Sequence, residues 1–471
     1  MTSQTQALVV GAGISGLSAA FALQKSGIAT ILVEAGPRPG GVIQSIRRDG
    51  YLLECGPQSF SGSVALAALC DELDLTGECV LADPKAPRYI FLNGTLRPVP
   101  VSPGAILTSP LLAGGTRTAI LRDALGKTTP PEPDESVGDF MRRKFSATLL
   151  DRLAGPFISG IYAGDPEKLS LRSALPMLYE AEKKSGSILR GMFSKKTPNP
   201  SDPIRPREKR TVQSFREGNE TLVRSLAAIL GNTLRLNVEA ISIQPLDCGH
   251  EANAPRFRVT LRTPQGSELC EAERLILAVP TSVAANLLVQ LDPLFESQLS
   301  AFEYPPVAVV SLGYRIADLG RAPNGFGFLV PRSSGLAILG TVWNSSLFPG
   351  RAPEGHGLFT TFVGGATNPG AAQQSEEALV ALVHRELAPI LSIRNATPPA
   401  FSPAFSNVTI WPRAIPQYNL GHSARVAALD AVCTKFPGLY LAGNFLSGPA
   451  LSNCLSLSQS IANAIRITFA N

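Results

Sequence analysis

Residues 7–34 read ALVVGAGISGLSAAFALQKSGIATILVE, and this stretch decides the fold of the chain around it. Its first residues, Ala7–Val10, are apolar and have the length of a strand. A glycine-rich turn follows at Gly11–Gly16, and apolar residues then recur at helical spacing over residues 14–21. A second apolar run ends in Glu34. This order of strand, GxGxxG turn, helix, strand and acidic residue is the context in which a dinucleotide-binding unit occurs.

Each conserved type of residue in such a unit has a physical task. Gly11 permits the tight turn, Gly13 leaves room for a pyrophosphate beside the backbone, and Gly16 lets the helix lie close to the strand. The helix N-terminus offers free N–H groups to the phosphates. Glu34 is placed to hold both hydroxyls of a ribose and to repel a 2′-phosphate, which disfavours NADP. An ordinary glycine-rich turn is the alternative, and the complete context argues against it.

The overall composition bounds the class of protein. The chain has 471 residues, which predicts two or three domains, and its 44% hydrophobic and 17% charged content is typical of a well-buried globular protein. A net charge of +5 is smaller than the strong basic charge that is typical of nucleic-acid-binding proteins, so no nucleic-acid partner is expected. The first residues lack the pattern of a signal peptide, and no run of 18 apolar residues predicts a membrane-spanning helix. These features favour a cytoplasmic protein.

Cysteine and histidine usage gives no sign of a metal site. Seven cysteines are scattered without a CxxC pair, and none of the four histidines stands at metal-ligand spacing from another ligand. We therefore expect reduced thiols and no bound metal.

Glycine-rich turns between a strand and a helix occur near both ends of the sequence. A second glycine pair, Gly40–Gly41, follows the nucleotide turn closely, and the loop that carries it must pass close to a partner. Near the C-terminus, residues 438–444 read as a strand that ends in a glycine, residues 448–454 as a turn, and a helix follows. A strand, a glycine turn and a helix at each end predict one long ligand held by both, which favours FAD over NAD.

The middle of the chain gives coarser expectations. Residues 88–97 form a hairpin with Asn93–Gly94 as its turn. Residues 137–153 are expected to form one helix, residues 160–166 a turn-rich segment and residues 234–243 one strand. Two further segments carry alternatives: residues 101–124 form either buried helices or a surface that rests on a membrane, and the basic residues 192–212 form either a solvated loop or a contact with anionic lipid.

Eight motifs along the chain together resemble one family. They are VVGAGISGLSAA, RPGG at 38–41, ECGP at 54–57, FISGIYAGDPEKLSLRSALP at 157–176, GFGFLVP at 325–331, TTFVGG at 360–365, WPRAIPQYNLGH at 411–422 and LYLAGNFLSGPALSNC at 439–454. The chain resembles the FAD-dependent oxidases that include amine oxidases and carotenoid desaturases, and within them the oxygen-dependent protoporphyrinogen oxidases. Two positions depart from the family pattern: Gln58 stands where Arg is common, and Ser458 where Gly is common.

The resemblance implies an α/β fold with a Rossmann-like FAD-binding domain, a β-rich substrate domain and an inserted helical domain that associates with membrane. The FAD-binding domain would comprise residues 1–73, 234–285 and 430–471. The substrate-binding domain would comprise 74–91, 213–233 and 286–429, and the helical domain 92–212.

The resemblance also implies the residues of two sites. Non-covalently bound FAD would contact Gly11, Gly13, Ile14, Ser15, Gly16, Glu34, Ala35, Gly40, Gly41, Val42, Gly56, Pro57, Gln58, Ser59, Val238, Ala278, Trp411, Gly443, Asn444 and Leu451. A porphyrinogen would contact Arg88, Gly160, Ala163, Gly164, Leu329, Val342 and Phe362. Arg88 would hold a propionate, the three apolar side chains would enclose the rings, and the backbone near Gly160–Gly164 would face the reacting carbon. From the residues alone, the apolar three read as ordinary core and Arg88 as a surface charge on a hairpin.

The implied reaction is the six-electron oxidation of protoporphyrinogen IX to protoporphyrin IX in haem biosynthesis. FAD takes up the electrons, dioxygen is the acceptor, peroxide is released, and no catalytic side chain is assigned. Coproporphyrinogen III is the alternative substrate, another amine oxidase or desaturase activity is a second alternative, and a binding protein without turnover is a third. Peripheral contact with the inner face of the cell membrane and transfer of product to the next enzyme of haem synthesis are further expectations.

Overall fold

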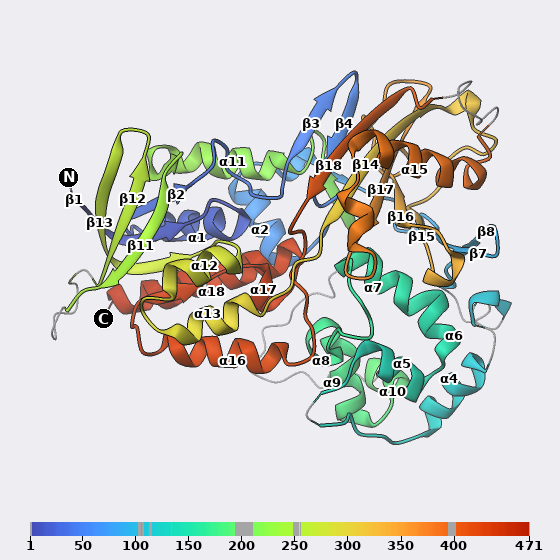
Figure 1. The fold of residues 1–471 in the computed structure, drawn as a ribbon, viewed down its shortest axis with the longest axis horizontal. Helices are drawn as coiled ribbons and strands as arrows, with labels where there is room; N and C mark the ends of the chain where they lie inside the picture. The colour runs from blue at the N-terminus through green and yellow to red at the C-terminus, as the bar shows by residue number, and fades with distance from the viewer. Residues whose placement is uncertain are drawn as a thin grey trace.

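The computed structural model describes residues 2–101, 105, 108–112, 115–132, 134–193, 211–247, 254, 256–393 and 402–470. Figure 1 shows the elements in three groups: a sheet with helices on the left, a second sheet at the upper right, and a cluster of short helices at the lower right. The first and last parts of the chain both lie in the left-hand group.

The first sheet has the order β10-β2-β1-β13-β12-β11. Strand β19 pairs with residues 275–277 of β13, beyond the residues that pair with β12. Its strands are β1 (Thr2–Val10), β2 (Thr30–Glu34), β10 (Leu234–Leu236), β11 (Glu239–Pro245), β12 (Phe257–Thr263), β13 (Gly266–Leu277) and β19 (Leu439–Leu441). Strand β1 lies between β2 and β13 and is parallel to both. Ala7–Val10 are buried because the central strand of such a sheet is covered on both faces.

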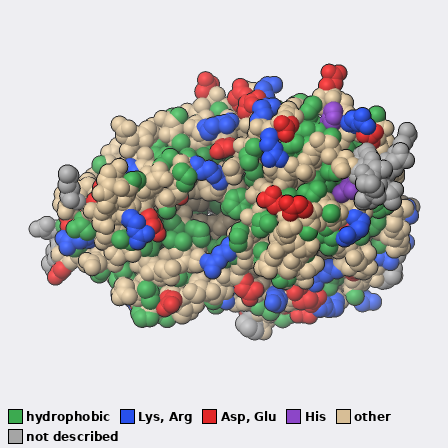
Figure 2. All heavy atoms as spheres, turned by 45° about the horizontal axis from the view of Figure 1, so that its top comes forward, with side chains coloured by type: hydrophobic (Ala, Val, Ile, Leu, Met, Phe, Trp, Pro, Cys, Tyr) green, Lys and Arg blue, Asp and Glu red, His purple; other side chains and the backbone are tan. Residues whose placement is uncertain are grey.

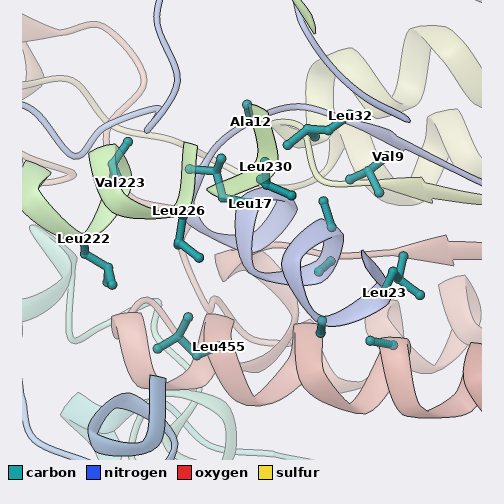
Figure 3. Packing of buried hydrophobic residues seen from close by; sticks show 14 of the residues in the cluster. Val9, Ala12, Leu17, Leu23, Leu32, Leu222, Val223, Leu226, Leu230 and Leu455 are labelled. Carbon is teal, nitrogen blue, oxygen red and sulfur yellow. The ribbon is translucent and has the colours of Figure 1, made fainter. Parts of the chain in front are cut away.

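Helix α1 (Ile14–Lys25) packs between two helices that come from distant parts of the sequence. These helices are α11 (Glu220–Leu230) and α18 (Leu451–Ala470). Figure 3 shows the shared core, in which Leu17 and Leu23 of α1 lie among Leu222 and Leu226 of α11 and Leu455 of α18. Helices α2 (Val64–Glu72), α12 (Thr281–Leu288), α13 (Pro293–Ser300), α16 (His422–Cys433) and α17 (Asn444–Ser447) complete this part.

The second sheet has the order β18-β14-β17-β16-β15-β7-β8. Its strands are β7 (Arg88–Leu92), β8 (Thr95–Pro98), β14 (Val307–Arg315), β15 (Gly327–Leu329), β16 (Ile338–Trp343), β17 (His356–Gly364) and β18 (Phe405–Trp411). One face carries large side chains such as Tyr314, Trp343 and Phe359, which form a core with α15 (Glu376–Ile390). The opposite face is turned towards helix α7 (Gly155–Tyr162), whose Gly160 lies against Leu329.

The remaining elements are short. They are the strands β3 (Ser45–Arg48), β4 (Tyr51–Glu54), β5 (Phe60–Ser61), β6 (Cys79–Leu81) and β9 (Val212–Phe215), and the helices α4 (Thr116–Leu125), α5 (Val137–Lys144), α6 (Ala147–Leu149), α8 (Leu171–Ala174), α9 (Pro176–Ser185), α10 (Ile188–Phe193) and α14 (Asn344–Leu347). Strands β3 and β4 form a hairpin, and β5, β9 and β6 form a small sheet.

The helical segment contains a buried group of charges. Lys144 lies 2.6 Å from Asp123 and 3.5 Å from Glu182, and Arg143 joins Glu182 to Glu135. Bonds to Lys144 and to backbone N–H groups outweigh burial and hold the pKa of Asp123 below its ordinary value. The group ties α4, α5 and α9 together.

Three expected elements are wrong in their limits. Residues 137–153 do not form one helix, because α5 ends at Lys144 and Ser146 caps a new start. Gly160 is not in a turn but in the last turn of α7, which ends at Tyr162. The expected strand 234–243 is two strands, since Asn237 has a positive φ of 56° that breaks the run.

Two limits of the expected domains also differ from the packing. The expected substrate-binding domain includes residues 213–233, but α11 buries its apolar face against α1, which belongs to the expected FAD-binding domain. The expected helical part begins at residue 92, but β8 continues the second sheet to Pro98. The three-part division itself stays a prediction.

Most of the basic segment 192–212 lies outside the described residues. In the described part of the chain no helix is long and apolar enough to cross a membrane.

Candidate functional site

The three glycines of the first turn lie in three different surroundings. A Cβ on Gly11, which has φ of 98°, would stand 2.5 Å from the carbonyl oxygen of Ala278, and one on Gly16 would stand 1.8 Å from that of Gly11. Both must therefore be glycine for the chain to close the turn. A Cβ on Gly13 would meet nothing within 4 Å, and its φ of −67° suits any residue. The chain keeps open space at Gly13, which is where a pyrophosphate would approach.

The second glycine pair lies directly against this turn. Gly13 and Gly40 form a parallel bridge, the N–H of Gly40 donates to the carbonyl of Ala12 at 2.7 Å, and Gly41 lies beside Gly13. The carboxylate of Glu34 accepts hydrogen bonds from the N–H groups of Ala12 and Gly36 at 2.8 and 2.9 Å. Loop, turn and acid thus form one cradle, which fits the adenosine and diphosphate portion of FAD.

A further turn, residues 55–58, joins this cradle to the second sheet. The amide of Gln58 donates to the carbonyls of Glu54 and Gly56 at 2.8 and 3.0 Å, and its oxygen accepts from Asn344 at 2.8 Å. The indole of Trp411 donates to the carbonyl of Cys55 at 2.7 Å. The departure at Gln58 therefore has a structural task, which is to brace its own turn and to hold α14.

A buried ion pair lies at the base of the same turn. Arg351 is 3.0 Å from Glu54, whose carboxylate also accepts from the N–H of Asn219 and the hydroxyl of Ser45. Asn219 in turn donates to the carbonyl of Pro57 at 2.7 Å. Burial raises the pKa of Glu54 to about 7, and the Arg351 guanidinium opposes this rise.

The C-terminal turn at Gly443–Phe445 is held from α16. The Nε2 atom of His422 bonds to the carbonyl of Phe445 at 2.9 Å, and the hydroxyl of Tyr418 donates to the carbonyl of Asn444. Burial lowers the pKa of His422, so its ring is neutral and its Nε2 carries the donated proton. From α18, the hydroxyl of Ser458 donates to the carbonyl of Ser15 at 2.8 Å, which ties the last helix to the first.

The other expected cofactor residues lie around the cradle or beside it. Ala278 follows β13 and binds the carbonyl of Val10, and Val238 binds that of Glu34. Ile14 and Ser15 open α1, Leu451 opens α18, Ala35 follows Glu34, and Val42 lies against Gly56. Pro57 and Ser59 flank Gln58 in the third turn. Their contacts with FAD stay a prediction.

Four of the expected substrate residues lie in the second sheet, on the face that is opposite α15. Phe362, Gly340 and Leu329 form one row across β17, β16 and β15. Val342, Gly327 and Arg88 form the next row across β16, β15 and β7. Because partners in register point to the same side, Arg88, Leu329, Val342 and Phe362 lie on one surface. The sequence alone could not place them together, since they come from four strands.

Arg88 is exposed and has no acidic partner among the described side chains. Its guanidinium lies over the ring of Phe326, 4.9 Å from the centroid. The apolar side chains beside it are partly buried. Arg97 of β8 stands in register with Ile90 and Leu329 and lies on the same face. The surface thus combines apolar area with exposed cations, which suits an apolar molecule with anionic arms.

Helix α7 faces this surface from the other side. A Cβ on Gly160 would stand 2.6 Å from the end of the Leu329 side chain, so glycine lets the helix approach without displacing that side chain. Phe157 and Ile161 are 48% and 40% exposed and lie on the same helical face as Gly160. Neither residue was predicted as part of the site, although their spacing of four within a helix was the available signal. Figure 2 shows a hollow near the middle of the molecule, with hydrophobic side chains around it.

Comparison with known proteins shows which proteins the chain is similar to. Residues 14–451 match the family described as flavin containing amine oxidoreductase. The chain is 36% identical to the chloroplastic protoporphyrinogen oxidase of Nicotiana tabacum over 98% of its length and 86% of that protein. It is 28% identical to the coproporphyrinogen III oxidase of Bacillus subtilis, over 98% of both chains. The cyclohexylamine oxidase structure from Brevibacterium oxydans has the same fold, with a TM-score of 0.70 at 17% identity, covering 99% of this chain and all of that one.

Proposed function

Because the chain belongs to the flavin-containing amine oxidoreductase family and is an FAD-dependent oxidoreductase, we propose that it oxidises protoporphyrinogen IX to protoporphyrin IX with dioxygen as acceptor. The observation that carries the proposal is the shared face of Arg88, Leu329, Val342 and Phe362 opposite α7. An apolar macrocycle with propionate arms matches such a face.

The residues of the chain bind and orient, and bound FAD would supply the electron-accepting chemistry. Arg88 would hold one propionate through its forked guanidinium. Leu329, Val342 and Phe362 would cover one side of the rings, and Phe157 and Ile161 of α7 the other. The close contact of Gly160 with Leu329 limits the space for water at that end. We assign no general base to this face.

The protoporphyrinogen preference rests on similarity and on charge. The relatives named protoporphyrinogen oxidase from Nicotiana tabacum and Spinacia oleracea are 36% and 38% identical, whereas the coproporphyrinogen III oxidase of Bacillus subtilis is 28% identical. Protoporphyrinogen has two propionates and coproporphyrinogen four, and the two exposed cations Arg88 and Arg97 on this face match the smaller number. A kcat/KM that is larger for coproporphyrinogen would reverse the preference.

The direct test is peroxide release from the purified protein on addition of protoporphyrinogen, coproporphyrinogen or an amine. Peroxide with the first substrate, together with the absorption of a porphyrin, is the expected result. Oxidation of the amine alone would identify an amine oxidase, and no turnover with any of them would identify a binding protein. Acid precipitation should release FAD into the supernatant, whereas flavin that stays in the pellet would contradict non-covalent binding.

We also propose peripheral membrane contact through α4. This helix exposes Leu121 and Leu125, which are 65% and 84% exposed one turn apart, next to the exposed Arg122. Apolar side chains beside a cation suit the surface of an anionic bilayer. The protein should sediment with vesicles that contain phosphatidylglycerol, and Leu121→Ser/Leu125→Ser should remain in the supernatant. Equal sedimentation of both proteins would exclude α4 as the contact.

A further inference from the structure

The last turn of α7 is fixed by a buried side chain from a distant segment. Gln417 is 2% exposed, and its amide nitrogen donates to the carbonyl of Tyr162 at 2.9 Å and to that of Ile415 at 3.0 Å. The backbone of Gln417 is held separately, since its N–H donates to Glu303 at 2.9 Å. The side chain therefore connects the end of α7 to a segment that is anchored elsewhere.

The turn to which Gln417 donates contains a residue with an unfavourable backbone conformation. Ala163 has a positive φ of 47°, which is unfavourable for a residue with a Cβ. Its carbonyl accepts a hydrogen bond from Ala366 at 2.7 Å, just beyond β17, the strand that carries Phe362. The turn is thus held on one side by β17 and on the other by Gln417.

The oxygen and the nitrogen of the Gln417 amide differ in their hydrogen bonding. This oxygen is buried without a hydrogen-bond partner, which is costly for a polar atom. It lies 2.7 Å from the position that a Cβ on Gly164 would take. Methionine or leucine would fill the same volume without a stranded oxygen, so packing alone does not account for an amide here. Its N–H donors do account for it.

We propose that Gln417 is a positioning residue for substrate oxidation, because it fixes the Tyr162–Gly164 turn against the reacting face of the substrate. The proposal rests on the proposed function and names a residue that acts through the turn rather than on the substrate. The hydrogen bonds of the Gln417 side chain reach neither the rows of the second sheet nor the glycine turns of the cradle. Its loss should therefore change how the substrate is aligned, and leave FAD affinity intact.

The test compares Gln417→Met with Gln58→Met. Gln58 is a matched control because it is also buried and also donates to two carbonyls, but in the flavin turn. Gln417→Met should retain FAD and lower kcat roughly tenfold, from the loss of hydrogen bonds that fix the turn, with KM changed less than about twofold. Gln58→Met should instead weaken FAD binding. A Gln417→Met protein with the kcat of the wild type, or one that loses FAD while its loaded fraction keeps full kcat, would overturn the proposal.

A second variant supplies a pH signature that a packing role would not give. In Gln417→Glu an ionised carboxylate faces two carbonyl oxygens and can donate to neither, whereas the neutral acid can donate to one. Its kcat should rise relative to the wild type as the pH falls. A pH profile parallel to that of the wild type would contradict the donor role.

Amide exchange gives a readout that needs no substrate. The N–H of Ala163 bonds to Ser159 at 3.0 Å, and its exchange should be faster in Gln417→Met than in the wild type, with or without FAD. Unchanged exchange would show that Gln417 does not hold the turn. If the wild type oxidises no porphyrinogen at all, the proposed function fails, and this measurement still decides whether Gln417 anchors α7.

Discussion

Gly13 is a glycine that the chain itself does not require. Its backbone angles suit any residue, and a Cβ would meet no protein atom within 4 Å, in contrast to Gly11 and Gly16 on either side. A bound diphosphate would explain the glycine, because Gly13 lies against Gly40 and Gly41 in the cradle, and this makes Gly13 the most informative single position there.

Gly13→Val should therefore fold normally and lose FAD, because its side chain would occupy the space of the pyrophosphate. The flavin absorbance of the purified variant measures this directly. Gly77→Val is the matched control, since a Cβ there also meets nothing within 4 Å, and it should keep its flavin. A folded Gly13→Val protein with full flavin content would exclude this turn as the binding site.

Arg88 allows a similar separation of roles on the substrate side. A charge-assisted bidentate pair contributes about 1.5–3 kcal/mol, so Arg88→Ala should lower kcat/KM by roughly ten- to a hundredfold. The loss should lie mainly in KM, because a propionate is held alike in the ground and transition states. Arg88→Lys should recover only part of it.

Arg321 provides the control for Arg88. It lies over the ring of Tyr89, whose side chain belongs to the opposite face of the same strand. Arg321→Ala should leave KM unchanged. If Arg88→Ala instead loses flavin or unfolds with a normal KM, then Arg88 is structural and Arg97 on the neighbouring strand β8 is the next candidate for the propionate.

At the scale of elements, the turn between β19 and α18 depends on the neutral ring of His422. Burial lowers its pKa below the ordinary value of 6.5. Between the lowered pKa and 6.5 the unfolded chain binds a proton that the folded chain does not, so stability falls as the pH decreases through this window.

The melting temperature of the wild type should therefore fall from pH 7 to pH 5 more steeply than that of His422→Gln. Glutamine can still donate to the carbonyl of Phe445 but does not titrate in this range. At pH 8 the two proteins should melt at similar temperatures, because the ring is neutral in both states. Identical slopes below pH 7 would show that His422 does not couple protonation to folding.

Local elements could be predicted from the sequence where the signal is contiguous. The β1–α1–β2 unit and the hairpin at Asn93–Gly94 both follow from residues next to one another in the chain. The break at Asn237 and the new helix start at Ser146 were not predicted, because a single polar residue inside an apolar pattern is a weak signal.

At the scale of the whole molecule, the two sheets are joined by pairs that no local pattern reveals. The partners of Arg351–Glu54, Gln58–Asn344 and Trp411–Cys55 are between 286 and 356 residues apart. Sequence spacing carries no register information over such distances. The resemblance to a family named candidate residues for both sites, but the contacts that connect these residues became visible only in three dimensions.

The Arg351–Glu54 pair should contribute most to stability among these braces. Removing one partner of a buried pair leaves an uncompensated charge and costs about 3–5 kcal/mol. Arg351→Met should lower the melting temperature and the urea midpoint at pH 8, and Arg351→Met/Glu54→Gln should recover part of the loss.

The exposed pair Arg262–Glu239 is the reference for this prediction. Its side chains are 62% and 50% exposed, so Arg262→Met should change stability by less than about 1 kcal/mol. Equal effects at the buried and the exposed pair would mean that Glu54 takes up a proton without cost when Arg351 is absent.

The central position of β1 has a consequence for the order of events during synthesis. Residues 2–10 are made well before residues 269–277, which are their neighbours on one side. Contacts of such long range form slowly, and until then an apolar strand has an unpaired edge that can associate with other chains. The strand that starts the cofactor cradle is thus exposed until a distant partner has been made, and we expect a chaperone to protect it.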